Sequence, residues 1–337
     1  MLSPYPWQAE AWQRLQAWRR SETLPHGLLL TGPLGSGKFD MARVFAQGLL
    51  CVRAVDGIPC GECQGCHWVE AGTHPDLRLI TFEVDEKTGK TAKEIKIAQI
   101  RELIEFAQLK SHTAPLRIAI VHPAEYMNRN AANSLLKTLE EPPPATYLIL
   151  IAHQPSRLPV TVRSRCQVLR LSARAEASAV NWLSRQSACH GIDPAPLLRE
   201  HGPLEALRLL ESGEWGARTT LLRQAGDLLR GTADPIGISS QWTRLNAIPL
   251  LACLESLLID VARLKAAGEE GMPVHKDLLP SLHDLAKALD FPKLFDTQAL
   301  IRESRQLLER GSNLREQDVL EEIALHLSAK PMEAMTP

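Results

Sequence analysis

A run of seven residues near the N-terminus, Gly32-Pro-Leu-Gly-Ser-Gly-Lys38, has the GxxxxGK spacing of a phosphate-binding loop. Glycines allow such a loop to curl so that its N–H groups point inward, and the N-terminus of the following helix adds positive potential. The candidate nucleotide-binding residues are therefore Gly32, Gly35, Gly37 and Lys38, with Lys38 reaching the outer phosphates.

The groups that normally act beside such a loop are missing. A Ser or Thr after the loop lysine would hold Mg²⁺, but this chain has Phe39. Hydrolysing sites of this type also end their third strand with an Asp–Glu pair. Here that strand is followed by His122 and Pro123, and Glu125 is displaced along the turn. Most of the electrostatic stabilisation of phosphoryl transfer is thereby lost. We expect no ATP hydrolysis, whereas nucleotide binding stays open because the glycines and Lys38 persist.

Four of the seven cysteines fall within sixteen residues, with Cys51 followed by Cys60, Cys63 and Cys66. Four thiolates at this spacing can hold one tetrahedral ion. The alternative is a set of reduced core cysteines, but packing gives no reason for them in a polar, glycine-rich loop. Clustering without an export signal favours metal over disulfides. The spacing predicts a structural Zn²⁺ site without an open coordination position.

Short apolar segments alternate with longer amphipathic ones in the first half of the chain. Strands are predicted over residues 27–31, 77–82, 117–121, 147–152 and 167–171. Helices are predicted over residues 39–50, 95–109 and 131–141. This alternation predicts an α/β fold, in which a mostly parallel sheet is covered on both faces.

Strand patterns end at about residue 172, which suggests further domains. The expected division is a large domain over 1–172 with the cysteine module at 51–66, a small helical lid over 173–211, and a helical region over 212–330. A stripe of leucines between Leu250 and Leu264 is typical of a buried helix face in that last region. Residues 331–337 are expected to be a flexible tail.

Composition restricts the possible partners and location. A chain of 337 residues with 45% hydrophobic residues can bury a sizeable core. Lys+Arg 38 nearly balances Asp+Glu 39, so no global charge draws the chain to nucleic acid or to an anionic membrane. The first twenty residues interleave tryptophans with charges, unlike a signal peptide, and the apolar runs are too short to span a bilayer. We expect a soluble, cytoplasmic protein with no membrane partner.

Several longer segments carry a family resemblance. They are Ala71–Asp76 (AGTHPD), Asn133–Pro143 (NSLLKTLEEPP), Arg157–Cys166 (RLPVTVRSRC) and the cysteine module. The run LLKTLEEPP followed by SRC is highly specific to clamp-loader subunits. The chain resembles the delta-prime family of bacterial DNA polymerase III clamp-loader subunits, which are AAA+ (P-loop NTPase-like) proteins. The resemblance is dense from about residue 5 to 172 and thinner beyond it.

The resemblance implies a function within a complex. Family members are non-hydrolysing, stator-like subunits of a hetero-pentameric ring with the gamma/tau and delta subunits, and their C-terminal helices form a collar. The ring loads the sliding clamp on primed DNA during DNA replication. The chain would then be no enzyme by itself but a component of a DNA-directed DNA polymerase, a nucleotidyltransferase.

The sequence motifs leave two alternatives to this function, a motor subunit and a nucleic-acid-binding module. The gamma/tau motor subunit shares the cysteine module and SRC, but it keeps Lys-Thr or Lys-Ser in the loop and an intact Asp–Glu pair. This chain departs at Phe39 and His122, and Glu205 occupies the place of the motor's phosphate-sensing arginine. A zinc-ribbon nucleic-acid module has little support, since the net charge is −1 and only 5% of residues are aromatic.

Arg165, the arginine of SRC, is the candidate catalytic residue. In the family it projects toward the ATP that the next subunit holds, as an arginine finger whose planar charge stabilises the transferring phosphoryl group. The alternative is a surface arginine paired with a carboxylate, the role we consider for Arg163 or Arg170. Cys166 is expected to be a small buried residue rather than a nucleophile.

Overall fold

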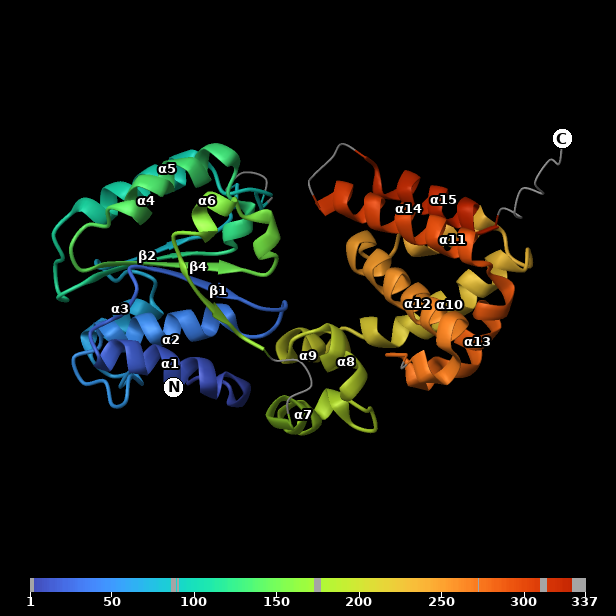
Figure 1. The fold of residues 1–337 in the computed structure, drawn as a ribbon, viewed down its shortest axis with the longest axis horizontal. Coiled ribbons are helices and arrows are strands. Elements are labelled where there is room, and N and C mark those ends of the chain that lie inside the picture. Colours follow the sequence, from blue (N-terminus) through green and yellow to red (C-terminus); the bar gives the residue numbers. More distant parts are fainter. Residues whose placement is uncertain are drawn as a thin grey trace. The chain divides into compact units, whose positions relative to one another are not determined.

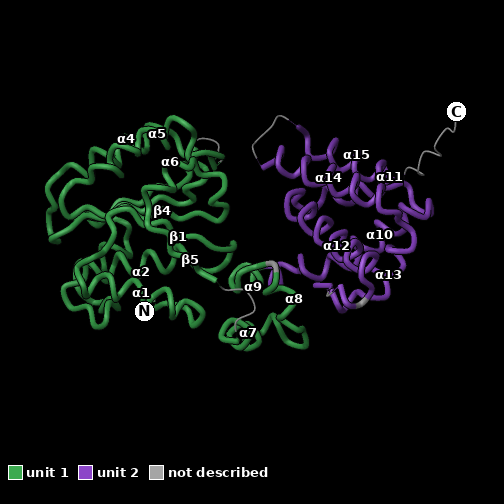
Figure 2. Tube along the Cα trace, in the orientation of Figure 1, with its two compact units in different colours: residues 1–208 green, residues 209–337 purple. Residues whose placement is uncertain are grey.

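The computed structural model describes residues 3–85, 89, 91–172, 177–271, 273–309 and 314–328. The chain divides into two compact units, Met1–Arg208 and Leu209–Pro337 (Figure 2). The expected tail at 331–337 lies outside the described residues. The three-domain division stays a prediction.

The first unit is built on a five-stranded sheet with the strand order β2-β3-β4-β1-β5 (Figure 1). The strands are β1 (Gly27–Thr31), β2 (Leu77–Ile80), β3 (Arg117–Val121), β4 (Thr146–Ala152) and β5 (Gln167–Arg170). Every neighbouring pair is parallel. All residues of β1 and β3 are buried, as expected for strands covered on both faces.

Helices cover both faces of this sheet. The first face carries α1 (Ala9–Arg20), α2 (Lys38–Leu50) and α3 (Gln64–Glu70), and the second carries α4 (Ile97–Gln108), α5 (Arg129–Glu140) and α6 (Val160–Arg163) (Figure 1). Alternation along β1 distributes its side chains between two cores. Leu28 and Leu30 join the core that contains Phe45 of α2, whereas Leu29 joins the core that contains Leu135 of α5.

Local chemistry explains where the predicted ends shift. β2 ends at Ile80 rather than at residue 82, and the next carbonyl, that of Thr81, accepts a 2.8 Å hydrogen bond from Gln99 Nε2. α5 begins before Ala131 because Asn128 caps it, with its side-chain oxygen 2.9 Å from the Ala131 N–H.

Three helices follow the sheet: α7 (Ala177–Ser184), α8 (Ala195–Glu200) and α9 (Pro203–Glu211). Short 3-10 turns lie at Pro6–Gln8, Ala124–Tyr126, Pro155–Arg157, Ser187–Cys189, Gly268–Gly271 and Lys276–Leu278.

Aromatic rings join α7 to the N-terminal turn. Tyr5 stacks on Trp7 at 4.8 Å between ring centroids, and Trp182 of α7 meets Trp7 edge-on at 5.1 Å.

The second unit is entirely helical over its described residues. Its helices are α10 (Glu214–Leu229), α11 (Pro235–Trp242), α12 (Ala247–Ala267), α13 (Leu279–Ala288), α14 (Phe291–Glu309) and α15 (Glu316–Ser328). The leucine stripe predicted between Leu250 and Leu264 is buried on α12, in one core with residues of the other five helices. None of the helices described in the chain is long and apolar enough to cross a membrane.

The fold class predicted from the sequence is confirmed: a parallel α/β sheet, a four-cysteine cluster and a helical C-terminal region.

Candidate functional site

The candidate phosphate loop connects β1 to α2, the strand–loop–helix arrangement that the motif requires. Its curl depends on glycine, because Gly35 and Gly37 have φ values of 77° and 74°. Gly37 is the N-cap of α2, and Lys38 is its first residue. The structure thus brings Gly32, Gly35, Gly37 and Lys38 together in one loop.

Lys38 points back into this loop. Its Nζ donates to the Gly32 carbonyl at 2.8 Å, the Pro33 carbonyl at 2.7 Å and the Ser36 hydroxyl at 3.2 Å. The residue is only 2% exposed. Burial lowers the pKa of Lys38 to about 8, although the nearby Glu125 charge opposes that shift. The three donors of the ammonium group are therefore occupied by the protein itself.

Aromatic rings lie in the region where the sequence lacks a metal-binding hydroxyl and the strand-end carboxylates. Phe39 stacks on His122 with ring centroids 5.0 Å apart, and His122 meets His153 edge-on at 5.3 Å. Burial, with a further contribution from the Lys38 charge, lowers the pKa of His122 to about 4 and that of His153 to about 3. Both imidazoles are neutral at physiological pH. Sequence reasoning missed His153, which follows β4.

Glu125 makes a structural contact through one carboxylate oxygen, while its other oxygen, Oε2, is buried without a hydrogen-bond partner among the described residues. Its Oε1 accepts hydrogen bonds from the backbone N–H groups of His153 at 2.7 Å and Gln154 at 3.0 Å. The carboxylate thus fixes the chain that leaves β4. That Glu125 does not replace the missing pair of acids stays a prediction.

The start of α9 lies directly on the phosphate loop. The N–H groups of Gly202 and Leu204 donate to the carbonyls of Leu34 and Gly35, each at 2.9 Å. A Cβ atom on Gly35 would overlap the backbone of Glu205, and one on Gly202 would overlap the backbone of the loop. The main chain at the start of α9 is therefore in direct contact with the main chain of the phosphate loop, which was not predicted from the sequence.

Glu205, which the family resemblance aligns with a phosphate-sensing arginine, lies in the first turn of α9; its correspondence to that arginine stays a prediction. Its carboxylate pairs with Arg208 at 2.8 Å, one turn along α9. A negative side chain at this position adds nothing favourable for a phosphate.

N-terminal residues cover another part of the loop. Trp7 Nε1 donates to the Ser36 carbonyl at 3.0 Å, and Gln8 Nε2 donates to the carbonyls of Ser36 at 2.8 Å and Gly37 at 2.9 Å. A Cβ atom on Gly37 would lie 2.8 Å from the Tyr5 ring. The loop is thus enclosed by protein groups from both the N-terminus and α9.

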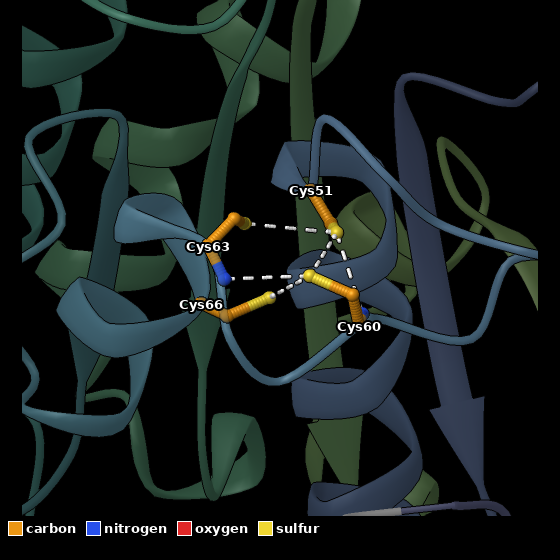
Figure 3. Close-up of side chains that lie close together, drawn as sticks. All are labelled: Cys51, Cys60, Cys63 and Cys66. Atoms are coloured by element: carbon orange, nitrogen blue, oxygen red, sulfur yellow. Dashed lines mark hydrogen bonds between the residues drawn. The ribbon is translucent and has the colours of Figure 1, made fainter.

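The four clustered cysteines converge on one point (Figure 3). Cys51 follows α2, Cys63 is the N-cap of α3, and Cys66 lies within α3. All four Sγ atoms lie within 4.8 Å of one another. Cys51 Sγ is 3.5 Å from Cys60 Sγ and 3.8 Å from Cys63 Sγ, and Cys60 Sγ is 4.0 Å from Cys66 Sγ. A tetrahedral ion with bonds of about 2.3 Å would separate its sulfurs by about 3.8 Å, so the cluster could hold a structural metal ion.

Backbone N–H groups favour anionic sulfur at Cys60, whereas burial raises the pKa of Cys66 to about 12. The N–H groups of Arg53 and Cys60 each lie 3.4 Å from Cys51 Sγ. The N–H groups of Glu62 and then Cys63 lower the pKa of Cys60 to about 6.

Arg165 lies between α6 and β5, half-buried, with its guanidinium held by neighbours. Nε donates to Glu140 Oε1 at 2.7 Å, Nη2 also pairs with Glu140, and Nη1 donates to the Thr161 carbonyl at 2.9 Å. The carboxylate pairing that we considered for a mere surface arginine is therefore present at Arg165 itself. Its side chain remains 35% exposed.

Sheet topology places Arg165 far from the phosphate loop. Arg165 precedes β5, whereas the loop follows β1, and these strands pair in parallel with Leu28 beside Gln167. The residue therefore lies at the amino edge of the sheet, and the loop lies at the carboxyl edge. Cys166 beside it packs against the core, where burial raises its pKa to about 11, as expected for a structural thiol.

Asp76, the last residue of AGTHPD, has a role that the sequence did not reveal. Its fully buried carboxylate accepts from the N–H groups of His112 at 2.7 Å, Thr113 at 2.8 Å and Ala114 at 3.0 Å, and from the Thr113 hydroxyl at 2.9 Å. Burial alone would raise the pKa of Asp76, but these hydrogen bonds outweigh it and lower the pKa to about 2. Asp76 thus fixes the loop that leads into β3.

Comparison with known proteins identifies the family. The family model described as DNA polymerase III, delta subunit matches residues 7–175, and the model for its C terminal part matches residues 212–329. DNA polymerase III subunit delta' of Pseudomonas aeruginosa is 31% identical over 98% of this chain and 99% of its own length, and that of Yersinia pestis is 30% identical over 90% and 89%. The tau/gamma subunit of Haemophilus influenzae is 37% identical, but over only 49% of this chain and 23% of its own length. The chain therefore belongs to the family of DNA polymerase III delta' subunits.

Proposed function

We propose that this delta' subunit is a non-hydrolysing, stator-like member of the clamp loader that completes the ATP site of a neighbouring motor subunit with Arg165. The observation that carries the proposal is the placement of Arg165 at the edge of the sheet opposite its own phosphate loop. An arginine so placed does not serve its own loop, but it is available to a site on an adjacent subunit.

The chemistry of the loop supports the absence of hydrolysis. Phe39 offers no ligand for Mg²⁺, and the neutral rings of His122 and His153 replace the carboxylates that would orient metal and water. Lys38 is hydrogen-bonded within its own loop. The main contributions to charge stabilisation in phosphoryl transfer are therefore missing.

The enclosure of the loop supports weak or absent nucleotide binding. A triphosphate requires the inward N–H groups of the loop and a free Lys38. Here α9 contacts the loop through Gly202 and Leu204, and Gln8 is hydrogen-bonded to the loop at Gly37. Nucleotide would have to displace contacts that the folded chain already makes.

We propose Zn²⁺ as the ion held by Cys51, Cys60, Cys63 and Cys66. Four thiolates at tetrahedral spacing suit zinc and leave no position for a substrate. The ion would link the end of α2 to α3 and supply rigidity without taking part in a reaction.

The family suggests the partners. We place the subunit in the cytoplasm, in a hetero-pentameric ring with the gamma/tau and delta subunits, with α10–α15 as its collar. Through that ring it would act on the sliding clamp and primed DNA, as part of the DNA-directed DNA polymerase. The gamma/tau-like alternative is not favoured, because Phe39 and His122 remove the motor's chemistry.

Reconstitution tests this function. Purified gamma/tau and delta subunits of the same bacterium are mixed with and without this chain, and loading of a fluorescent clamp onto primed DNA is measured. We expect loading to depend on the chain. Full loading in its absence would contradict the proposal.

A further inference from the structure

We propose that Glu140 is a positioning residue for Arg165, which holds the guanidinium ready to act on a neighbouring ATP. This inference rests on the proposed function, because it assigns to Glu140 a role in the reaction that Arg165 would assist. Glu140 is the last residue of α5. Its side chain is 48% exposed, so packing in the core does not explain a glutamate at this position.

The backbone on both sides of this pair is fixed to the start of β1. The Leu139 carbonyl is hydrogen-bonded to His26 Nε2 at 2.9 Å. A Cβ atom on Gly27 would lie 3.1 Å from the Leu139 side chain and 3.2 Å from the Arg165 carbonyl. Glycine at this position lets the end of α5 and the SRC segment approach the same point. The distance between Glu140 and Arg165 is therefore set by the main chain.

The contact leaves part of the guanidinium available. Arginine has five N–H donors in a planar fork. Glu140 accepts from Nε and from Nη2, and Thr161 accepts from Nη1. Nη2 keeps one further N–H, and the second N–H of Nη1 donates only to the Ser164 hydroxyl, in a long 3.4 Å hydrogen bond that a phosphate oxygen could replace. Two terminal N–H groups on one edge are the arrangement that binds a phosphate with two hydrogen bonds.

Holding the fork in advance should accelerate the reaction that it assists. An unheld arginine samples many rotamers, and ordering it at the moment of engagement slows the reaction. Immobilising one such side chain corresponds to a rate difference of about 3- to 10-fold. Glu140→Gln keeps the shape of the side chain but removes the charge-assisted bonds. It should therefore slow the site that Arg165 serves, by much less than loss of Arg165 itself.

Single-turnover ATP hydrolysis by the rebuilt clamp loader, with clamp and primed DNA, tests the inference. The complexes carry wild-type chain, Glu140→Gln, Arg165→Ala or the double variant. We expect Glu140→Gln to slow the fraction of ATP held beside this subunit by about 3- to 10-fold, with assembly and the ATP concentration dependence unchanged. The double variant should be no slower than Arg165→Ala, because Glu140 acts only through Arg165. Glu141→Gln, which removes the adjacent exposed carboxylate, is the control and should match wild type.

The outcomes separate the inference from the proposed function. Arg165→Ala with wild-type hydrolysis overturns the proposed function. A slow Arg165→Ala site together with normal or faster hydrolysis in Glu140→Gln overturns the role of Glu140 alone. An equal further loss on adding Glu140→Gln to Arg165→Ala also overturns that role, because it would mean a general structural effect. Thermal unfolding of each isolated variant shows whether the chain remains folded.

Discussion

Arg165 and Lys38 lie at opposite edges of one parallel sheet, Arg165 before β5 and Lys38 after β1. The strands between these edges are four or five residues long, which corresponds to about 13–17 Å at about 3.3 Å per residue. The Arg165 guanidinium of one chain is therefore too far from the phosphate loop of the same chain to act on a phosphate bound there. Any joint action requires two chains.

The isolated protein should not hydrolyse ATP above background. Phe39→Thr alone should not create turnover, because Lys38 stays engaged with its own loop and the residues directly after β3, His122 and Pro123, carry no carboxylate. Phosphate release and equilibrium binding of a fluorescent ATP analogue measure both properties. Turnover that Lys38→Ala abolishes would contradict this prediction.

Replacing Gly202 by Ala should destabilise the first unit. The added methyl group would overlap the backbone of the phosphate loop, and overpacking of this kind costs about 1–3 kcal/mol. Urea unfolding measures the loss. Gly216→Ala on α10 is the matched control, because open space surrounds that position, and it should not destabilise the chain. Equal stability of the two variants would mean that the contact between α9 and the loop is loose.

Protein purified under reducing conditions should carry one zinc ion per chain. Elemental analysis should find it lost from a Cys60→Ser/Cys63→Ser double variant, because two of four sulfur ligands are then missing. Cys253→Ser, which changes a cysteine outside the cluster, should retain the metal. Full metal content in the double variant would count against the assignment.

Arg165→Ala should leave the isolated subunit folded and able to assemble, yet silence one ATP site of the complex. Arginine fingers that act in trans contribute about 10³–10⁵ in rate. Arg165→Lys should restore little, because an ammonium group lacks the planar fork. Steady-state hydrolysis of rebuilt complexes measures the effect, with Arg170→Ala as an exposed control on β5.

Asp76 should make stability depend on acid pH. Its pKa is about 2 in the folded chain and about 3.9 when unfolded, so the ionised form stabilises the fold by about 2–3 kcal/mol above pH 5. That contribution falls away as the pH drops from about 4 toward 2. Asp76→Asn should be less stable at pH 7, and its difference from wild type should shrink at low pH in urea unfolding. Asp56→Asn, at an exposed position, should show no such trend.

Local patterns in the sequence were enough for the sheet and the cysteine cluster. β1 and β3 have the predicted bounds because each is a short apolar run between polar or turn residues. The cysteine cluster was predictable because three of its residues fall within seven positions of the sequence, which already keeps their sulfur atoms close in space.

The enclosure of the phosphate loop was not predictable in the same way. Gly202 is hydrogen-bonded to Leu34, although most of the sequence of the first unit lies between them. No periodic pattern in the sequence predicts which loop the start of a helix will contact. Asp76 likewise shows its role only once the residues at 112–114 are placed around it. Contacts between segments far apart in the chain depend on packing that short sequence windows do not contain.

The backbone contact between α9 and the phosphate loop has a consequence for regulation by metabolism. Where a phosphate loop holds nucleotide, the contacts around it can change with the nucleotide that is bound. Here Gly202 and Leu204 link α9 to the loop with main-chain hydrogen bonds. The arrangement of α9 on the loop should therefore not depend on the supply of ATP, because the folded chain itself provides the contact.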